Sequence, residues 1–198
     1  MRNKIFTTPK GVAWYPHLRT PETFEGSEIG YTIKVMFDTE TALKFQQHLE
    51  AELEKAKAAF PGKNFKNPFL GASEDNDGNL MFKFKANTSF KTKAGDIIHR
   101  TIPIYDSTGK PLDEKADIGT GSVVRVAYSI FPYYKSAQTN GLSLRLEAVQ
   151  VIEYKAPYSK DAESYGFGTE EGGYVADEDN NSDLFPPDEV AADEGADF

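Results

Sequence analysis

The sequence contains no cysteine among its 198 residues, and it has only three histidines. The first absence excludes disulfide bonds and zinc sites built on cysteine, and it fits a reducing cytoplasm. The histidines, His17, His48 and His99, are too scattered to form a paired metal-binding motif. The sequence therefore predicts no metal site and no cofactor.

Long apolar runs are also missing. No stretch approaches the roughly 20 apolar residues that a membrane helix needs. The opening MRNKIFTTPKG lacks the apolar core of a secretory signal. We therefore expect no membrane partner and a location in the cytoplasm.

Catalytic motifs are absent as well. The segment GTGSVVRV (119–126) lacks the lysine that a phosphate-binding loop requires after its glycines. A metal-dependent nuclease needs carboxylates fixed on rigid elements, and no such set is evident in residues 1–155. The sequence predicts that the protein is not an enzyme.

Basic residues are nearly missing from the C-terminal segment. Residues 156–198 contain thirteen acidic residues and one basic residue, a net charge of -12, whereas residues 1–155 carry 21 basic and 18 acidic residues, a net charge of +3. Such asymmetry is typical of a nucleic-acid-binding body with an acidic tail, although acidic tails also serve solubility alone. We predict a folded domain over 1–155 and a disordered, partner-binding acidic tail over 156–198, because the tail has too few apolar residues for a core.

The remaining sequence alternates as β-strands do. Strands are expected over 11–18 (closed by Pro16), 31–37, 80–86, 101–105, 122–134 and 142–154, the last two as a long hairpin with Ala148 on its apolar face. A helix follows Asp38 and stops at Pro61-Gly62; its apolar stripe is Ala42, Phe45, Leu49, Leu53, Ala56 and Phe60. This order favours a mainly β fold: a five-stranded Greek-key barrel of the oligonucleotide-binding (OB) type with one substantial helix. A β-sandwich covered by a helix is the alternative.

Cations recur on the polar faces of the expected strands. They would share one surface if the strands share one sheet, and such a surface would bind phosphates. The basic candidates are Lys34, Lys83, Lys85, Lys91, Lys93, Arg100, Arg125, Lys135 and Arg145. Unpaired bases also need flat side chains for stacking, and the candidates are Trp14, Tyr15, Tyr105, Phe131, Tyr133 and Tyr134. Trp14 could instead be a core residue, in which case alternation exposes Tyr15.

The segments TPKGVAWYPHL, YTIKVMFD and GLSLRLEAVQVIEY, followed by an acidic tail ending in Asp-Phe, resemble the single-stranded DNA-binding proteins of T7-type bacteriophages. The resemblance implies a protein that coats exposed single strands in phage DNA replication, recombination and repair, in the cytoplasm of an infected bacterium. It also implies that the tail recruits a DNA polymerase, a helicase-primase or a nuclease through Phe198, supported by Asp193, Glu194 and Asp197. Some members of the group dimerise, so a homodimer is possible.

Two other functions fit the same residues. In one, the acidic tail makes the chain a protein-binding module or a DNA mimic. In the other, the body is an RNA-binding OB protein, although no reader of the 2′-hydroxyl is visible in the sequence. Our expectation is a non-enzymatic single-stranded DNA-binding protein whose tail competes with DNA for the basic surface.

Overall fold

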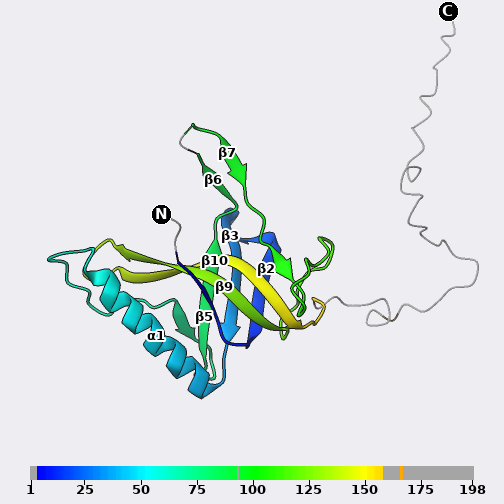
Figure 1. Cartoon of the computed structure of the whole chain (residues 1–198), viewed down its shortest axis with the longest axis horizontal. Coiled ribbons are helices and arrows are strands. Elements are labelled where there is room, and N and C mark those ends of the chain that lie inside the picture. Colours follow the sequence, from blue (N-terminus) through cyan, green and yellow to red (C-terminus); the bar gives the residue numbers. More distant parts are fainter. Residues whose placement is uncertain (1–3, 93, 158–165, 167–198) are drawn as a thin grey trace, which may run out of the picture. The chain divides into compact units, whose positions relative to one another are not determined.

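The computed structural model describes residues 4–92, 94–157 and 166, and Figure 1 shows its arrangement. Within these residues the chain forms one α-helix and a set of strands, most of them in a single sheet. The elements are β1 (Ile5–Thr7), β2 (Gly11–Phe24), β3 (Ser27–Met36), α1 (Thr39–Lys57), β4 (Ala72–Glu74), β5 (Leu80–Ala86), β6 (Ser89–Lys91), β7 (Ile97–His99), β8 (Ile104–Tyr105), β9 (Val123–Tyr134) and β10 (Asn140–Glu153).

Five of these strands close into a barrel. β2 pairs with β3, β3 with β5, β5 with β10, β10 with β9, and β9 returns to β2. All of these pairs are antiparallel except β5 with β10, which is parallel. β1 and β8 extend the sheet beyond the ring. The predicted five-stranded OB barrel is confirmed, and the sandwich alternative is wrong.

The barrel interior contains the apolar face of each strand. Tyr31, Ile33 and Val35 of β3 and Phe82 and Phe84 of β5 are buried, as the alternation in the sequence predicts. The same holds for one face of the hairpin, which contributes Val124, Val126, Tyr128, Leu142, Leu144 and Leu146. The opposite faces carry the polar residues and point outward.

Helix α1 closes one end of the barrel (Figure 1). Asp38 caps it: its carboxylate accepts a hydrogen bond of 3.0 Å from the backbone N–H of Thr41, as predicted. The buried stripe consists of Ala42, Phe45, Leu49 and Leu53. Phe45 packs against Phe82 at 4.8 Å between ring centroids. The helix is therefore held by an aromatic contact with the barrel interior, and it ends at Lys57, before Pro61-Gly62.

Strand β2 is longer than expected, because Pro16 does not end it. The chain continues to Phe24 through a bulge at Tyr15, whose φ of 47° lies in the left-handed region. The missing N–H of Pro16 falls where the pairing of β2 with β3 is interrupted, between Trp14 and His17. A bulge tolerates a proline that a regular ladder would not.

A second bulge corrects the expectation for Ala148. The register of β10 against β9 shifts between Leu146 and Ala148, so Glu147 is an extra residue in the strand. Beyond it the inward positions are Val149 and Val151, which are buried, while Ala148 lines the outside. A one-residue insertion exchanges the two faces of a strand, and simple alternation cannot reveal it.

The predicted tail, residues 156–198, lies outside the described residues apart from Ala156, Pro157 and Gly166. In the part of the chain that the structure describes, no helix has both the length and the apolar character required to cross a bilayer.

Candidate nucleic-acid interface

A row of cations crosses the outer face of the barrel. Lys34 on β3 is directly opposite Lys83 on β5. Two positions along, Lys85 of β5 is in register with Arg145 of the parallel strand β10. Neighbours in register project from the same face of a sheet. Four of the predicted cations therefore occupy one surface on three neighbouring strands.

Part of this surface is hollowed into a groove of about 540 Å³. We call it the basic groove, and its lining is Lys85, Asn87, Ser89, Phe90, Arg100, Ser143 and Arg145. Within the described residues, Lys85 and Arg145 form no salt bridge. Both side chains are exposed, so their charges are available to an anion in the groove.

Arg100 is held more tightly than the other two cations. Its guanidinium donates a hydrogen bond of 3.1 Å to the Leu146 carbonyl and forms a salt bridge with Glu147. The other carboxylate oxygen of Glu147 accepts from the Ser129 hydroxyl at 2.6 Å. Glu147 is the inserted residue of the β10 bulge, so the bulge supplies the counter-ion that orients Arg100 at the groove.

Arg145 and Phe131 form a stacked pair. The guanidinium carbon lies 3.7 Å from the centroid of the Phe131 ring, which is half-buried. In the register of β9 and β10, Ser143 is opposite Phe131 and Arg145 is opposite Ser129. The Arg145 side chain therefore extends diagonally across the strands to cover the Phe131 ring. A guanidinium held flat in this way presents both a charge and a planar surface on which a base can stack.

The rings of Trp14 and Tyr15 lie close together at the bulge in β2. Their ring centroids are 5.9 Å apart, and the ammonium of Lys34 lies 5.8 Å from the Tyr15 centroid. Tyr15 is 58% exposed, whereas Trp14 is half-buried. The indole N–H of Trp14 is buried and has no acceptor among the described residues. Of the two rings, Tyr15 is thus the one available for stacking.

Lys83 is partly neutralised by an acid that the sequence did not indicate. Its ammonium lies 3.0 Å from the Glu22 carboxylate, which also accepts a 2.7 Å hydrogen bond from the Thr32 hydroxyl. Burial alone would raise the pKa of Glu22, but the hydrogen bonds from Thr32 and Lys83 and the charge of Lys83 together lower it. A carboxyl group with a lowered pKa stays ionised down to acidic pH, so the pair persists at neutral pH and is lost only as the pH falls through that lowered value.

Replacing Glu22 with glutamine should therefore release the charge of Lys83 and strengthen the binding of a polyanion. We expect oligo-dT to bind about two- to threefold more tightly at low salt, since a half-exposed ion pair is worth roughly 0.2–1 kcal/mol. Fluorescence anisotropy titrations at two salt concentrations measure the change, and the gain should vanish at high salt. Weaker binding by the variant would show that Glu22 instead holds Lys83 in its binding position.

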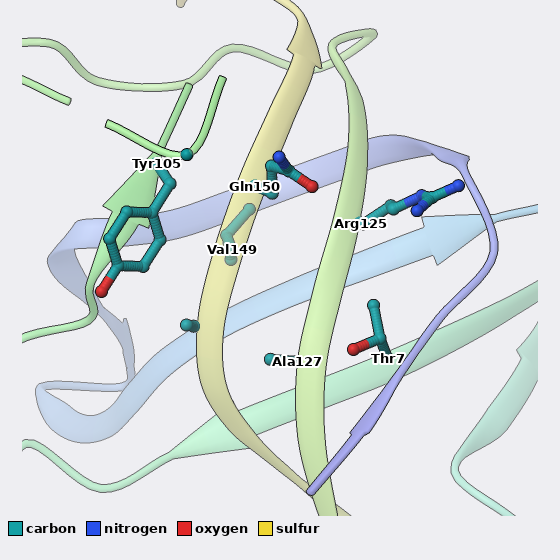
Figure 2. Close-up of a pocket in the computed structure, with 8 residues that line it drawn as sticks. Thr7, Tyr105, Arg125, Ala127, Val149 and Gln150 are labelled. Atoms are coloured by element: carbon teal, nitrogen blue, oxygen red, sulfur yellow. The ribbon is translucent and has the colours of Figure 1, made fainter. Parts of the chain in front are cut away.

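Other predicted residues lie away from the basic groove. Tyr105 and Arg125 line a separate hollow of about 360 Å³ over β9 and β10, together with Thr7, Gln150 and small apolar residues (Figure 2). Tyr134 packs against Phe65 at 5.2 Å between centroids, which ties the hairpin end to the segment that follows α1. The structure therefore places these three residues apart from the groove cations.

The remaining candidate residues from the sequence analysis do not line the basic groove, or they lie outside the residues that the structure describes. Tyr133 is half-buried opposite Gly141, Lys135 is exposed where β9 ends, and Lys91 is exposed on β6. Lys93 and the tail residues Asp193, Glu194, Asp197 and Phe198 lie outside the described residues.

The sequence analysis missed four groove residues, Asn87, Ser89, Phe90 and Ser143, and the two counter-ions Glu22 and Glu147. Phe90 could have been found, because it is an aromatic residue within the basic stretch 81–100. The two acids could not be found in this way, because their partners, Lys83 and Arg100, come from distant parts of the chain. Among the described residues, no group of three or more acidic or histidine side chains could hold a metal ion.

A comparison with protein families agrees with a nucleic-acid-binding surface on the barrel. The family model described as the single-stranded DNA-binding protein of bacteriophage T7 matches residues 6–154. The chain belongs to this family. The matched region contains every strand of the barrel and the whole of α1.

Individual relatives of the T7 family agree with this assignment. The single-stranded DNA-binding protein of Enterobacteria phage T3 is 33% identical over 111 residues, which cover 55% of this chain and 48% of the relative. That of Escherichia phage T7 is 34% identical over 105 residues, covering 52% and 45%. The chain thus spans about half the length of these two curated relatives.

Solved structures share the fold. The crystal structure of gp2.5, the single-stranded DNA-binding protein encoded by bacteriophage T7, superposes with a TM-score of 0.57 at 27% identity and covers 89% of this chain and all of the other. The single-stranded DNA-binding protein of bacteriophage Enc34 in complex with single-stranded DNA gives a TM-score of 0.54 at 14% identity, covering 78% and 89%. The second likeness concerns the fold alone.

Proposed function

We propose that this chain is a non-enzymatic phage protein that binds single-stranded DNA in the basic groove. The observation that carries the proposal is the convergence of Lys85, Arg100 and Arg145 from separate parts of the chain on one groove. The exposed cations Lys85 and Arg145 neutralise phosphates there. The flat group of Arg145 in the groove, and the ring of Tyr15 beside Lys34, offer stacking surfaces to unpaired bases. Membership of the T7 family supports this function over the alternatives.

A titration with matched nucleic acids tests the proposal. We expect oligo-dT to bind more tightly than a duplex of the same length, because paired bases cannot stack on protein side chains. The single tryptophan, Trp14, gives an intrinsic fluorescence signal, and the dependence of affinity on salt estimates the number of phosphates neutralised. Absence of any affinity for oligonucleotides would favour a DNA mimic, and a preference for oligo-U would favour RNA binding.

The acidic tail is proposed to compete with DNA and to recruit other proteins. Residues 156–198 carry a net charge of -12, opposite in sign to the body. DNA has a higher charge density and stacking bases, so it would displace the tail. The released acidic residues, with Phe198 as an aromatic anchor, would then bind a basic surface on a DNA polymerase, helicase-primase or nuclease in the host cytoplasm. We also propose that the protein can form a homodimer.

Deletion of residues 180–198 should strengthen the binding of oligo-dT by several fold at low salt. The deletion removes six acidic residues and no basic residue, so it removes half of the net charge of -12 that competes with DNA. The expected gain falls as salt rises, because screening weakens the competition. Gel-shift titrations of the intact and shortened chains at two salt concentrations measure it, and equal affinities at low salt would refute competition.

A further inference from the structure

An exposed apolar hairpin borders the basic groove. β6 and β7 form a two-stranded sheet of their own, and Figure 1 shows this hairpin projecting from the barrel. Three of its six strand residues are large, apolar and exposed: Phe90 at 53%, Ile97 at 66% and Ile98 at 45%. A two-stranded hairpin is marginally stable by itself, and exposed apolar side chains clustered on it indicate a surface that binds something.

The register divides these side chains between two faces. Phe90 is directly opposite Ile98, so both project from the same face of the hairpin. Lys91 is opposite Ile97, and these two project from the other face. Phe90 and its neighbour Ser89, the first residue of β6, line the basic groove, and Ile98 shares the face of Phe90, whereas Ile97 does not line the groove.

The charges around the hairpin decide what can cover it. Lys85, Arg100 and Arg145 line the same groove as Phe90, and Lys91 lies next to Phe90 on β6. A second copy of the chain that docked through this patch on a twofold axis would bring like charges together, which is unfavourable. A single strand of DNA combines phosphates for the cations with apolar base faces for Phe90 and Ile98.

We propose that the β6–β7 hairpin is a clamp that packs Phe90 and Ile98 against the bases of a DNA strand held in the basic groove. The inference rests on the proposed function and assigns a role to a part of the fold outside the barrel. The clamp adds contact without adding charge. It should therefore slow the dissociation of DNA while leaving the number of neutralised phosphates unchanged.

Stopped-flow dissociation of labelled oligo-dT from the full-length chain tests the clamp. Phe90→Ala should raise the dissociation rate about tenfold, in keeping with the loss of one stacked base. Ile98→Ser should raise it by a smaller factor. Ile97→Ser is the matched control, because it removes a more exposed residue from the opposite face, and it should leave the rate unchanged. The salt dependence of the affinity should stay the same in all three variants.

Two further measurements separate base contacts from other causes. An oligonucleotide with abasic sites should bind Phe90→Ala and the wild type equally, because it offers no bases to pack on. Phe90→Trp should bind like the wild type, and oligo-dT should quench its fluorescence beyond the change that Trp14 alone gives in the wild type, whereas Ile97→Trp should show only the wild-type change. Circular dichroism confirms that each variant is folded.

The outcomes distinguish the clamp from the function on which it rests. If the wild type does not bind oligo-dT, the proposed function fails. If the wild type binds and Phe90→Ala dissociates at the wild-type rate, only the clamp is overturned. Equal effects of Phe90→Ala and Ile97→Ser would also overturn it, because they would indicate a general destabilisation of the hairpin.

Discussion

Replacing Lys85 and Arg145 together by alanine should weaken the binding of oligo-dT by about 100-fold at low salt. Each cation can make a charge-assisted contact with a phosphate, and such a contact contributes roughly 1.5 kcal/mol. The loss of two phosphate contacts should also reduce the slope of log affinity against log salt by about 1.4. Anisotropy titrations at several salt concentrations give both quantities.

The matched control is the double variant Lys44→Ala, Lys55→Ala. It removes the same net charge from α1, which contributes no residue to the basic groove. Its affinity should stay within about twofold of the wild type. If both double variants lose affinity equally, the protein binds DNA through its overall charge, and the groove has no special role.

Arg145→Lys separates the charge of Arg145 from its flat surface. Lysine keeps the positive charge but cannot lie flat on Phe131 as the guanidinium does at 3.7 Å. The variant should therefore lose about five- to tenfold in affinity with an unchanged salt dependence. Wild-type affinity would mean that Arg145 acts only as a point charge.

Phe45→Ala should lower the free energy of unfolding by about 3–5 kcal/mol, the usual cost of emptying a phenylalanine site in a core. Phe45 is buried, and its ring contacts Phe82 at 4.8 Å and Tyr128 at 5.8 Å between centroids. The cavity would separate α1 from the barrel interior. Urea unfolding followed by circular dichroism measures the loss.

Leu43→Ala on the same helix is the control for this prediction. Leu43 is 52% exposed, so its truncation should change the free energy of unfolding by less than about 1 kcal/mol. Under conditions where Phe45→Ala is still folded, its affinity for oligo-dT should match that of the wild type. A small effect of Phe45→Ala on stability would mean that α1 is not part of the cooperative core.

Alternation and periodicity in the sequence were enough to predict most of the fold. Val124, Val126 and Tyr128 are buried, and the stripe of α1 begins after the cap at Asp38, as these patterns indicate. Two failures have the same cause. The sequence predicts a strand end at Pro16 and an inward position for Ala148, and both predictions are wrong because a bulge changes the register without leaving a periodic signal.

The kinds of residue in the candidate site could be predicted from the sequence, but which of them line the same groove could not. Cations on the polar faces of strands could be read from the sequence, yet the reading did not separate Lys85 and Arg145, which line the groove, from Arg125, which lines another hollow. It also missed Glu22, which pairs with Lys83. Counter-ions that come from distant strands leave no local pattern.

The sequence was sufficient to predict most of the inward-facing residues up to the β10 bulge, the start of the helix, and a cationic body followed by an acidic segment. These properties depend on neighbours in the chain, through the two-residue repeat of a strand and the 3.6-residue turn of a helix. That β5 lies beside β10 is visible only in the folded barrel, because strand neighbours depend on the packing of all the strands together. That pairing places Lys85 next to Arg145, and these two cations form part of the lining of the basic groove.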